Sequence, residues 1–131
     1  MIVLDTGVVV RALLGLSLPA AVEHAMAAGS VAPDVVVFET IAVFRRMDGR
    51  GALPSSRLAR ALDDLGRFPL LLEPALGLRH AAWKLRHNIT ARDALFVVLA
   101  DALRAPLATT DSRLALSAAR HAGIDVIHLP A

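Results

Sequence analysis

Four acidic residues stand at places in the sequence where their side chains could together bind a divalent metal ion. Asp5 directly follows the apolar run IVL, Glu39 lies inside VVVFETIAVF, Asp93 follows the segment ITA, and Asp111 follows APLATT. Converging carboxylates repel one another unless a cation offsets their charge. Ligands that are all oxygen, in a chain without cysteine, favour Mg²⁺, with Mn²⁺ as an alternative, over zinc.

Each of the three aspartates also has a purely structural explanation. Asp5 or Thr6 can cap a helix that begins there, and Asp111 can cap a helix that begins at 112. Thr90 and Asp93 have the spacing of a capping box. For a single aspartate at a helix start, capping is the commoner role.

Glu39 has no such explanation. It lies about six residues beyond Pro33, which is too far into the predicted helix for a cap. Its neighbours one helical turn away are apolar, and a helix that is apolar on all sides is normally buried. A buried carboxylate takes up a proton or needs a cation. That cation is either an arginine, such as Arg45, Arg46 or a distant one, or a metal ion shared with the aspartates.

Short apolar runs alternate with helical patterns along the chain. The strand candidates cover residues 2–4, 31–32, 69–74, 105–110 and 125–129. The helix candidates cover residues 7–14, 17–28, 33–47, 55–66, 75–87, 91–104 and 112–122. Ser55 or Ser56 is expected to cap the helix at 55–66. This alternation predicts an α/β fold, a three-layer α/β/α sandwich with a mostly parallel sheet of four to five strands. Ligands of such sheets bind beyond the carboxyl ends of the strands, where Asp5 and Asp111 are expected.

The composition indicates one packed domain over residues 1–131, because 56% of the residues are hydrophobic and the chain is too short for two cores. The apolar runs are shorter than the roughly 20 residues of a membrane span. The first residues lack the basic segment of a signal peptide. Zero cysteines fit a reducing compartment, so we expect a cytoplasmic protein without a membrane partner.

The charge distribution suits a nucleic acid as ligand. The chain has 14 basic and 12 acidic residues, and 13 of the basic residues are arginine. If four acids form a metal site, eight remain against 14 basic residues, which leaves a surface charge of 14 − 8 = +6. An acidic pocket on a basic surface is the profile expected of a nuclease.

Four motifs carry a resemblance to a known family. They are VLDTGVVVRALL, FETIAVFRR, TARDALFVVLADAL and LATTDSRLALSA, in this order along the chain. Together they resemble the motifs of PIN-domain ribonucleases, in particular the VapC toxins of bacterial toxin–antitoxin pairs. The resemblance runs nearly from end to end.

The resemblance implies a role for several residues. Asp5, Glu39, Asp93 and Asp111 match the acidic metal ligands of the family. Thr6 and Thr109 match hydroxyls that flank these acids. Arg45 and Arg46 match a basic pair, and we expect them to bind RNA. One departure is Gly7, where the family commonly has a serine that supports the site.

The activity implied is Mg²⁺-dependent hydrolysis of RNA by a metal-activated water, as the toxin of a toxin–antitoxin pair. The implied partners are a VapB-like antitoxin, the RNA substrate and a second copy of the chain. Two alternatives remain open. One is a catalytically degenerate PIN-like module that binds RNA or protein, and the other is a phosphoacceptor receiver domain. A receiver would need an aspartate after the third strand, where this chain has Glu73 and Pro74. The five histidines are expected to be surface or structural residues.

Overall fold

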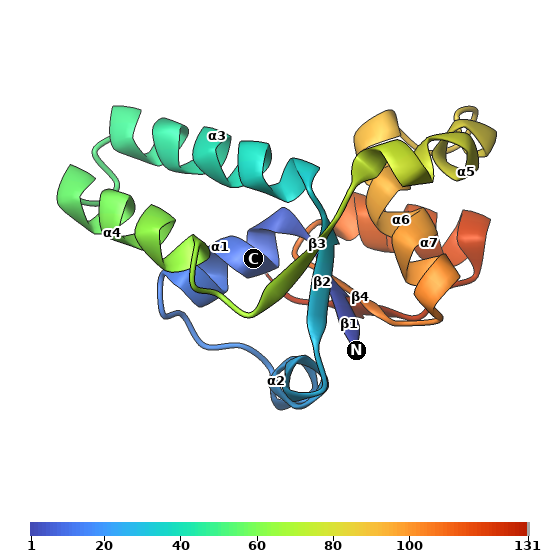
Figure 1. Ribbon diagram of the computed structural model, residues 1–131, viewed down its shortest axis with the longest axis horizontal. Helices are drawn as coiled ribbons and strands as arrows, with labels where there is room; N and C mark the ends of the chain where they lie inside the picture. The colour runs from blue at the N-terminus through green and yellow to red at the C-terminus, as the bar shows by residue number, and fades with distance from the viewer. Residues whose placement is uncertain (131) are drawn as a thin grey trace.

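A five-stranded parallel sheet forms the centre of the protein in the computed structural model, which describes residues 1–130 (Figure 1). The strand order is β3-β2-β1-β4-β5, and each neighbouring pair is parallel. The strands are β1 Ile2–Leu4, β2 Ser30–Pro33, β3 Leu70–Glu73, β4 Leu107–Thr109 and β5 Val126–His128. The predicted parallel sheet is thus confirmed, with five strands.

Helices cover both faces of this sheet, which confirms the predicted three layers (Figure 1). On one face lie α1 Thr6–Leu13, α3 Val35–Gly49 and α4 Ser55–Leu65. On the other lie α5 Arg79–Lys84, α6 Ala91–Leu103 and α7 Ser112–Ala122. The short helix α2, Ala20–Ala27, sits near the amino end of β1.

The core lies around the two central strands and α6. Ile2, Leu4 and Leu107 are fully buried in the sheet, and Phe96 of α6 is fully buried against it. Strands buried on both faces read as continuous apolar runs, which is why IVL was recognisable as a strand. No helix within residues 1–130 is long and apolar enough to cross a bilayer.

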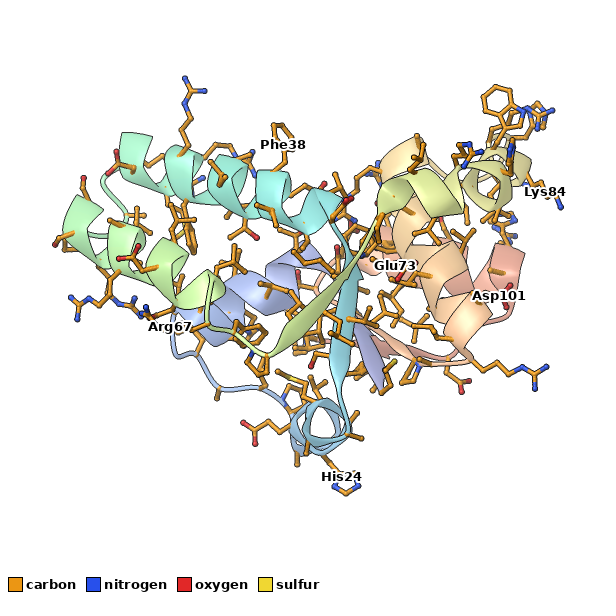
Figure 2. All side chains as sticks on the ribbon, viewed as in Figure 1. His24, Phe38, Arg67, Glu73, Lys84 and Asp101 are labelled. Carbon is orange, nitrogen blue, oxygen red and sulfur yellow. The ribbon has the colours of Figure 1, made fainter. Side chains whose placement is uncertain are left out.

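Helix α3 corrects one expectation. Its apolar sequence predicted a helix buried on all sides, but only the face with Val36, Thr40 and Phe44 is buried. Phe38 is 70% exposed and Ile41 is 49% exposed on the other face. Figure 2 shows Phe38 projecting away from the sheet. The reason is that α1 and α4 pack beneath α3 and no described segment covers its outer side.

Two local predictions were also wrong. The helix expected over 75–87 is a 3₁₀ turn at Ala75–Leu78 followed by the short helix α5. The predicted serine cap of α4 is absent, because Pro54 occupies the cap position and the Ser55 hydroxyl donates to Asp48. All five histidines are exposed, in agreement with the expected surface role: His24, His80, His87, His121 and His128.

Candidate active site

The acidic residues come from four different elements that meet at the carboxyl edge of the sheet. Asp5 directly follows β1, and Asp111 lies two residues after the neighbouring strand β4. Glu39 is in the second turn of α3, and Asp93 is in the first turn of α6. The parallel pairing of β1 with β4 continues past the strand, since the Asp5 amide donates to the Ala108 carbonyl at 2.9 Å. Asp5 and Thr109 are therefore held next to each other.

Two threonine hydroxyls fix the orientation of these carboxylates. Thr109 Oγ1 donates to Asp5 Oδ2 at 2.5 Å and accepts from the Asp111 amide at 3.0 Å. Thr6 Oγ1 donates to Glu39 Oε1 at 2.6 Å. Both threonines are buried. A charge-assisted hydrogen bond from a buried hydroxyl is short and directional, so it holds its carboxylate partner in one orientation.

Arg92, which the sequence analysis did not single out, lies in the middle of three of the acids. Its Nε donates to Glu39 Oε2 at 2.7 Å and its Nη1 to Asp93 Oδ1 at 3.0 Å. Its Nη2 donates to Glu39 Oε1 at 2.8 Å, to Thr6 Oγ1 at 3.2 Å, and to Asp5. The arginine partner considered for Glu39 is thus present, and the same arginine brings Asp5 and Asp93 to Glu39.

The electrostatics of the cluster keep Arg92 charged. Burial would lower the pKa of Arg92, but the hydrogen bonds that Arg92 donates to Glu39 and to Asp5, together with the negative charges of both carboxylates, outweigh burial and raise that pKa above its ordinary value. Its guanidinium also lies over the ring of Phe96, with 4.3 Å from Cζ to the ring centroid. Cation–π stacking on a buried ring adds to the fixation of the group.

Asp111 lies beside this cluster and also caps a helix. Its Oδ1 accepts from the amides of Arg113 and Leu114, at 2.9 and 3.2 Å, which confirms the predicted cap of α7. It lines one open pocket together with Thr6, Gly7, Phe38, Glu39, Ala42, Val43, Arg46 and Arg92. A capping role and a place at the acidic pocket are therefore compatible.

The other two predicted caps are also present. Asp5 accepts from the amide of Thr6 at the start of α1. Thr90 accepts from the amide of Asp93 at 3.3 Å at the start of α6. The capping explanation holds for the carboxylates of Asp5 and Asp111. At the start of α6 the cap is the Thr90 side chain, and the Asp93 carboxylate accepts from Arg92 instead.

The donor chemistry at this edge fits a hard cation. Carboxylates and hydroxyls supply only oxygen, which Mg²⁺ and Mn²⁺ prefer. Within residues 1–130, however, no three Asp, Glu, His or Cys side chains are arranged ready to hold a metal ion. Arg92 explains this, since its guanidinium lies between the carboxylates of Asp5, Glu39 and Asp93.

The two arginines of the predicted basic pair differ in their position relative to the acidic pocket. Both Arg45 and Arg46 are exposed on α3, but only Arg46 lines the acidic pocket. Arg46 is therefore the better placed of the two to meet an anionic ligand of this pocket.

The departure at Gly7 has a local explanation. A Cβ atom added to Gly7 would lie 2.2 Å from Oγ1 of Thr110. The Thr110 hydroxyl thus fills the space where the family resemblance led us to expect a serine side chain. The glycine leaves room for a hydroxyl that comes from the loop after β4.

We expect Gly7→Ser to lower the free energy of unfolding by about 1–3 kcal/mol, because the new side chain overpacks this contact. In a Thr110→Ala background the same substitution should cost clearly less. Urea unfolding of the four proteins of this double-mutant cycle measures the coupling. Gly49→Ser is the control, because nothing lies within 4 Å of a Cβ at Gly49. Equal costs in both backgrounds would contradict the proposed contact.

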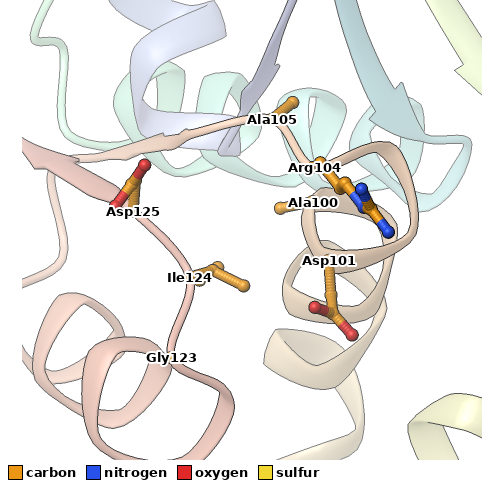
Figure 3. A pocket seen from close by; sticks show the side chains of 7 residues that line it. All are labelled: Ala100, Asp101, Arg104, Ala105, Gly123, Ile124 and Asp125. Atoms are coloured by element: carbon orange, nitrogen blue, oxygen red, sulfur yellow. The ribbon is translucent and has the colours of Figure 1, made fainter.

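A second hollow lies at the opposite end of the sheet, between the end of α6 and the start of β5 (Figure 3). Asp101 and Asp125 are on its walls, and Figure 3 shows their carboxylates pointing apart. It therefore lacks the convergence of charged groups found at the carboxyl edge.

Comparisons with known proteins identify the family of this chain. The sequence profile of the PIN domain family matches residues 2–127. Ribonuclease VapC1 of Mycobacterium tuberculosis is 37% identical over 119 residues, which cover 86% of this chain and 87% of that protein. Ribonuclease VapC9 of the same species and a VapC ribonuclease of Mycobacterium bovis are each 37% identical over 82 residues, 63% of this chain.

The matched segment covers 65% of the length of the VapC9 and Mycobacterium bovis proteins, just under two thirds. The match of the PIN profile spans nearly the whole chain, and the match to VapC1 covers most of both proteins. The chain therefore belongs to the PIN-domain family and, within it, to the VapC group.

Proposed function

We propose that this protein is a divalent-metal-dependent endoribonuclease that acts as the toxin of a toxin–antitoxin pair. The observation that carries the proposal is the convergence of Asp5, Glu39 and Asp93 on one point, with Asp111 on the wall of the same pocket. The relatives named as VapC ribonucleases support the activity. The absence of cysteine is consistent with action in the cytoplasm.

In this proposal Asp5 and Asp93 would be the first residues to hold Mg²⁺, with Glu39 and Asp111 as the other carboxylates of the site. A bound ion would supply a water of lowered pKa and would neutralise charge on a phosphodiester. The chain's own residues hold the acids in place: Thr109 orients Asp5, and Thr6 orients Glu39. Mn²⁺ has the same preference for oxygen ligands and is expected to substitute.

Basic residues around the pocket would bind the RNA backbone. Arg46 is the first candidate because it lines the pocket, and Arg45 is a weaker one on the same exposed helix. Salt should weaken this contact, since each neutralised phosphate releases counterions.

We expect the purified protein to cleave RNA in Mg²⁺ and to lose that activity in excess EDTA. The reason is that the described residues lining the acidic pocket include no histidine or lysine that could act as a base without a metal ion. Gel analysis of a structured RNA, with Mg²⁺ added back after EDTA, makes the measurement. Equal cleavage with and without EDTA would overturn the metal dependence.

A VapB-like antitoxin is the proposed protein partner, and a homodimer the proposed assembly. Phe38 is 70% exposed and lines the acidic pocket, so a protein that covers Phe38 would also block access to the acids. Co-expression with a small neighbour-encoded protein should yield a complex that no longer cuts RNA. A fully active protein after co-expression would count against this partner.

The two rival functions make different predictions. A degenerate PIN-like module would bind RNA without metal-dependent turnover. Its only support in the sequence was Gly7, and the Thr110 hydroxyl that fills the adjacent space weakens that support. A receiver domain is not favoured, because β3 is an edge strand and ends at the exposed Glu73.

A further inference from the structure

All three nitrogens of the Arg92 guanidinium are engaged by acids of the candidate site. Nε and Nη2 bind the two oxygens of Glu39, at 2.7 and 2.8 Å, as a bidentate pair. Nη1 binds Asp93 at 3.0 Å, and Nη2 also binds Asp5. These oxygens belong to the carboxylates that would ligate a divalent ion. A metal ion and this guanidinium therefore need the same atoms.

Two of the three acids have side-chain supports other than Arg92. Asp5 is fixed by Thr109, and Glu39 by Thr6. The backbone of Asp93 is held in the first turn of α6, where its amide donates to Thr90, while its carboxylate contacts Arg92. Without Arg92 the carboxylates of Asp5 and Glu39 would keep their supports, Asp93 would stay on the same turn of α6, and like charges close together attract a cation.

Arg92 can also leave the cluster without unfolding the helix that carries it. Its side chain is 31% exposed, against 4% for Asp5, 11% for Asp93 and 19% for Glu39. It is the second residue of α6, so a change of rotamer moves the guanidinium toward solvent while the helix continues from the Thr90 cap. The guanidinium of Arg92 can therefore move away from the cluster, while the three carboxylates, which are more deeply buried, remain at the edge of the sheet.

We propose that Arg92 is a built-in competitor of the divalent metal, and that it sets the metal affinity of the acidic site. This inference rests on the proposed function for the identity of the ion. In this role Arg92 neutralises part of the carboxylate charge until the ion displaces its guanidinium. Arg92 is thus a positioning residue of the site. Removing its side chain should strengthen metal binding. The same change should lower the stability of the metal-free protein.

Isothermal titration of Mg²⁺ into the EDTA-treated, dialysed protein tests this, with no RNA present. Arg92→Gln should bind Mg²⁺ about tenfold more tightly than the wild type, which corresponds to about 1.4 kcal/mol. Arg92→Lys keeps the charge but not the fork of donors, so its affinity should lie between the two. Arg60→Gln on the exposed side of α4 removes the same charge away from the acids and should leave the affinity unchanged.

Thermal unfolding of the same proteins supplies a second readout. In EDTA, Arg92→Gln should melt at a lower temperature than the wild type, and added Mg²⁺ should raise its Tm by more than it raises that of the wild type. If Arg92→Gln does not fold in EDTA, Arg92→Lys decides the outcome in both assays.

Metal affinity in the Arg92 variants equal to or weaker than that of the wild type would overturn the proposal. A protein that binds Mg²⁺ as described but cuts no RNA would contradict the proposed ribonuclease activity and leave the competition intact. The two failures are therefore distinguishable.

Discussion

Asp5→Asn should reduce RNA cleavage by about 100-fold or more, the size of loss found when one preorganised group that stabilises a transition state is removed. Asp5 is the most buried acid of the cluster, and it contacts both Thr109 and Arg92. Asparagine has nearly the same shape but no negative charge, so it removes a proposed metal ligand while the β1 edge keeps its packing. Cleavage rates at saturating Mg²⁺ make the measurement.

Asp101→Asn is the matched control for this substitution. Asp101 is an exposed aspartate on α6 at the opposite end of the sheet, where Figure 2 labels it. Asp101→Asn should cut RNA at the wild-type rate. Circular dichroism should show that both variants are folded. A normal rate for Asp5→Asn would remove the acidic cluster from the mechanism.

Phe96→Ala should lower the free energy of unfolding by about 3–5 kcal/mol, the usual cost when a buried phenylalanine is truncated. Phe96 is fully buried in α6, between the central strands and the site. Its ring also supports the Arg92 guanidinium at 4.3 Å, so the site loses a wall together with the core contact. Urea denaturation gives the size of the effect.

Two variants calibrate the loss at Phe96. Phe96→Leu preserves most of the volume and should cost less than about 1.5 kcal/mol. Phe38→Ala makes the same truncation at a position that is 70% exposed, and it should stay within about 0.5 kcal/mol of the wild type. If Phe96→Ala were as stable as Phe38→Ala, the placement of the Phe96 ring in the hydrophobic core would be wrong.

The sequence was sufficient for the order of the elements and for the meeting place of the acids. Buried parallel strands are short apolar runs, and the residues that follow them must lie at one edge of the sheet. This logic predicted that Asp5 and Asp111 would come near each other. Glu39 drew attention because a carboxylate inside an apolar helix requires a partner.

Arg92 was missed because its contact with Glu39 joins residues 53 positions apart in the chain. As partners of the Glu39 carboxylate, the sequence offers Arg45, Arg46 or a distant arginine, and no pattern specifies which distant arginine that is. The one signal in the sequence was that Arg92 directly precedes Asp93 in the motif TARDALF. A cation next to one acid of a predicted cluster can reach the other acids as well.

The hydrophobic pattern of the sequence also could not show which face of α3 is buried and which is exposed. Val36 and Phe44 are buried while Phe38 and Ile41 are exposed, although all four are apolar. Hydrophobicity is the same on both faces, so only the tertiary packing of α1 and α4 decides which face is covered. The same holds for Thr110, whose contact with Gly7 joins the start of α1 to the loop after β4.

The most direct test of the ribonuclease account is to map RNA 5′ ends in cells after induction of the wild type and of Asp93→Asn. Asp93 contacts Arg92 at 3.0 Å in the cluster and is expected to ligate the metal. We expect new 5′ ends at a defined site in cells that express the wild type, and none at that site with Asp93→Asn. Identical 5′ ends with both proteins, or no new ends with either, would contradict it.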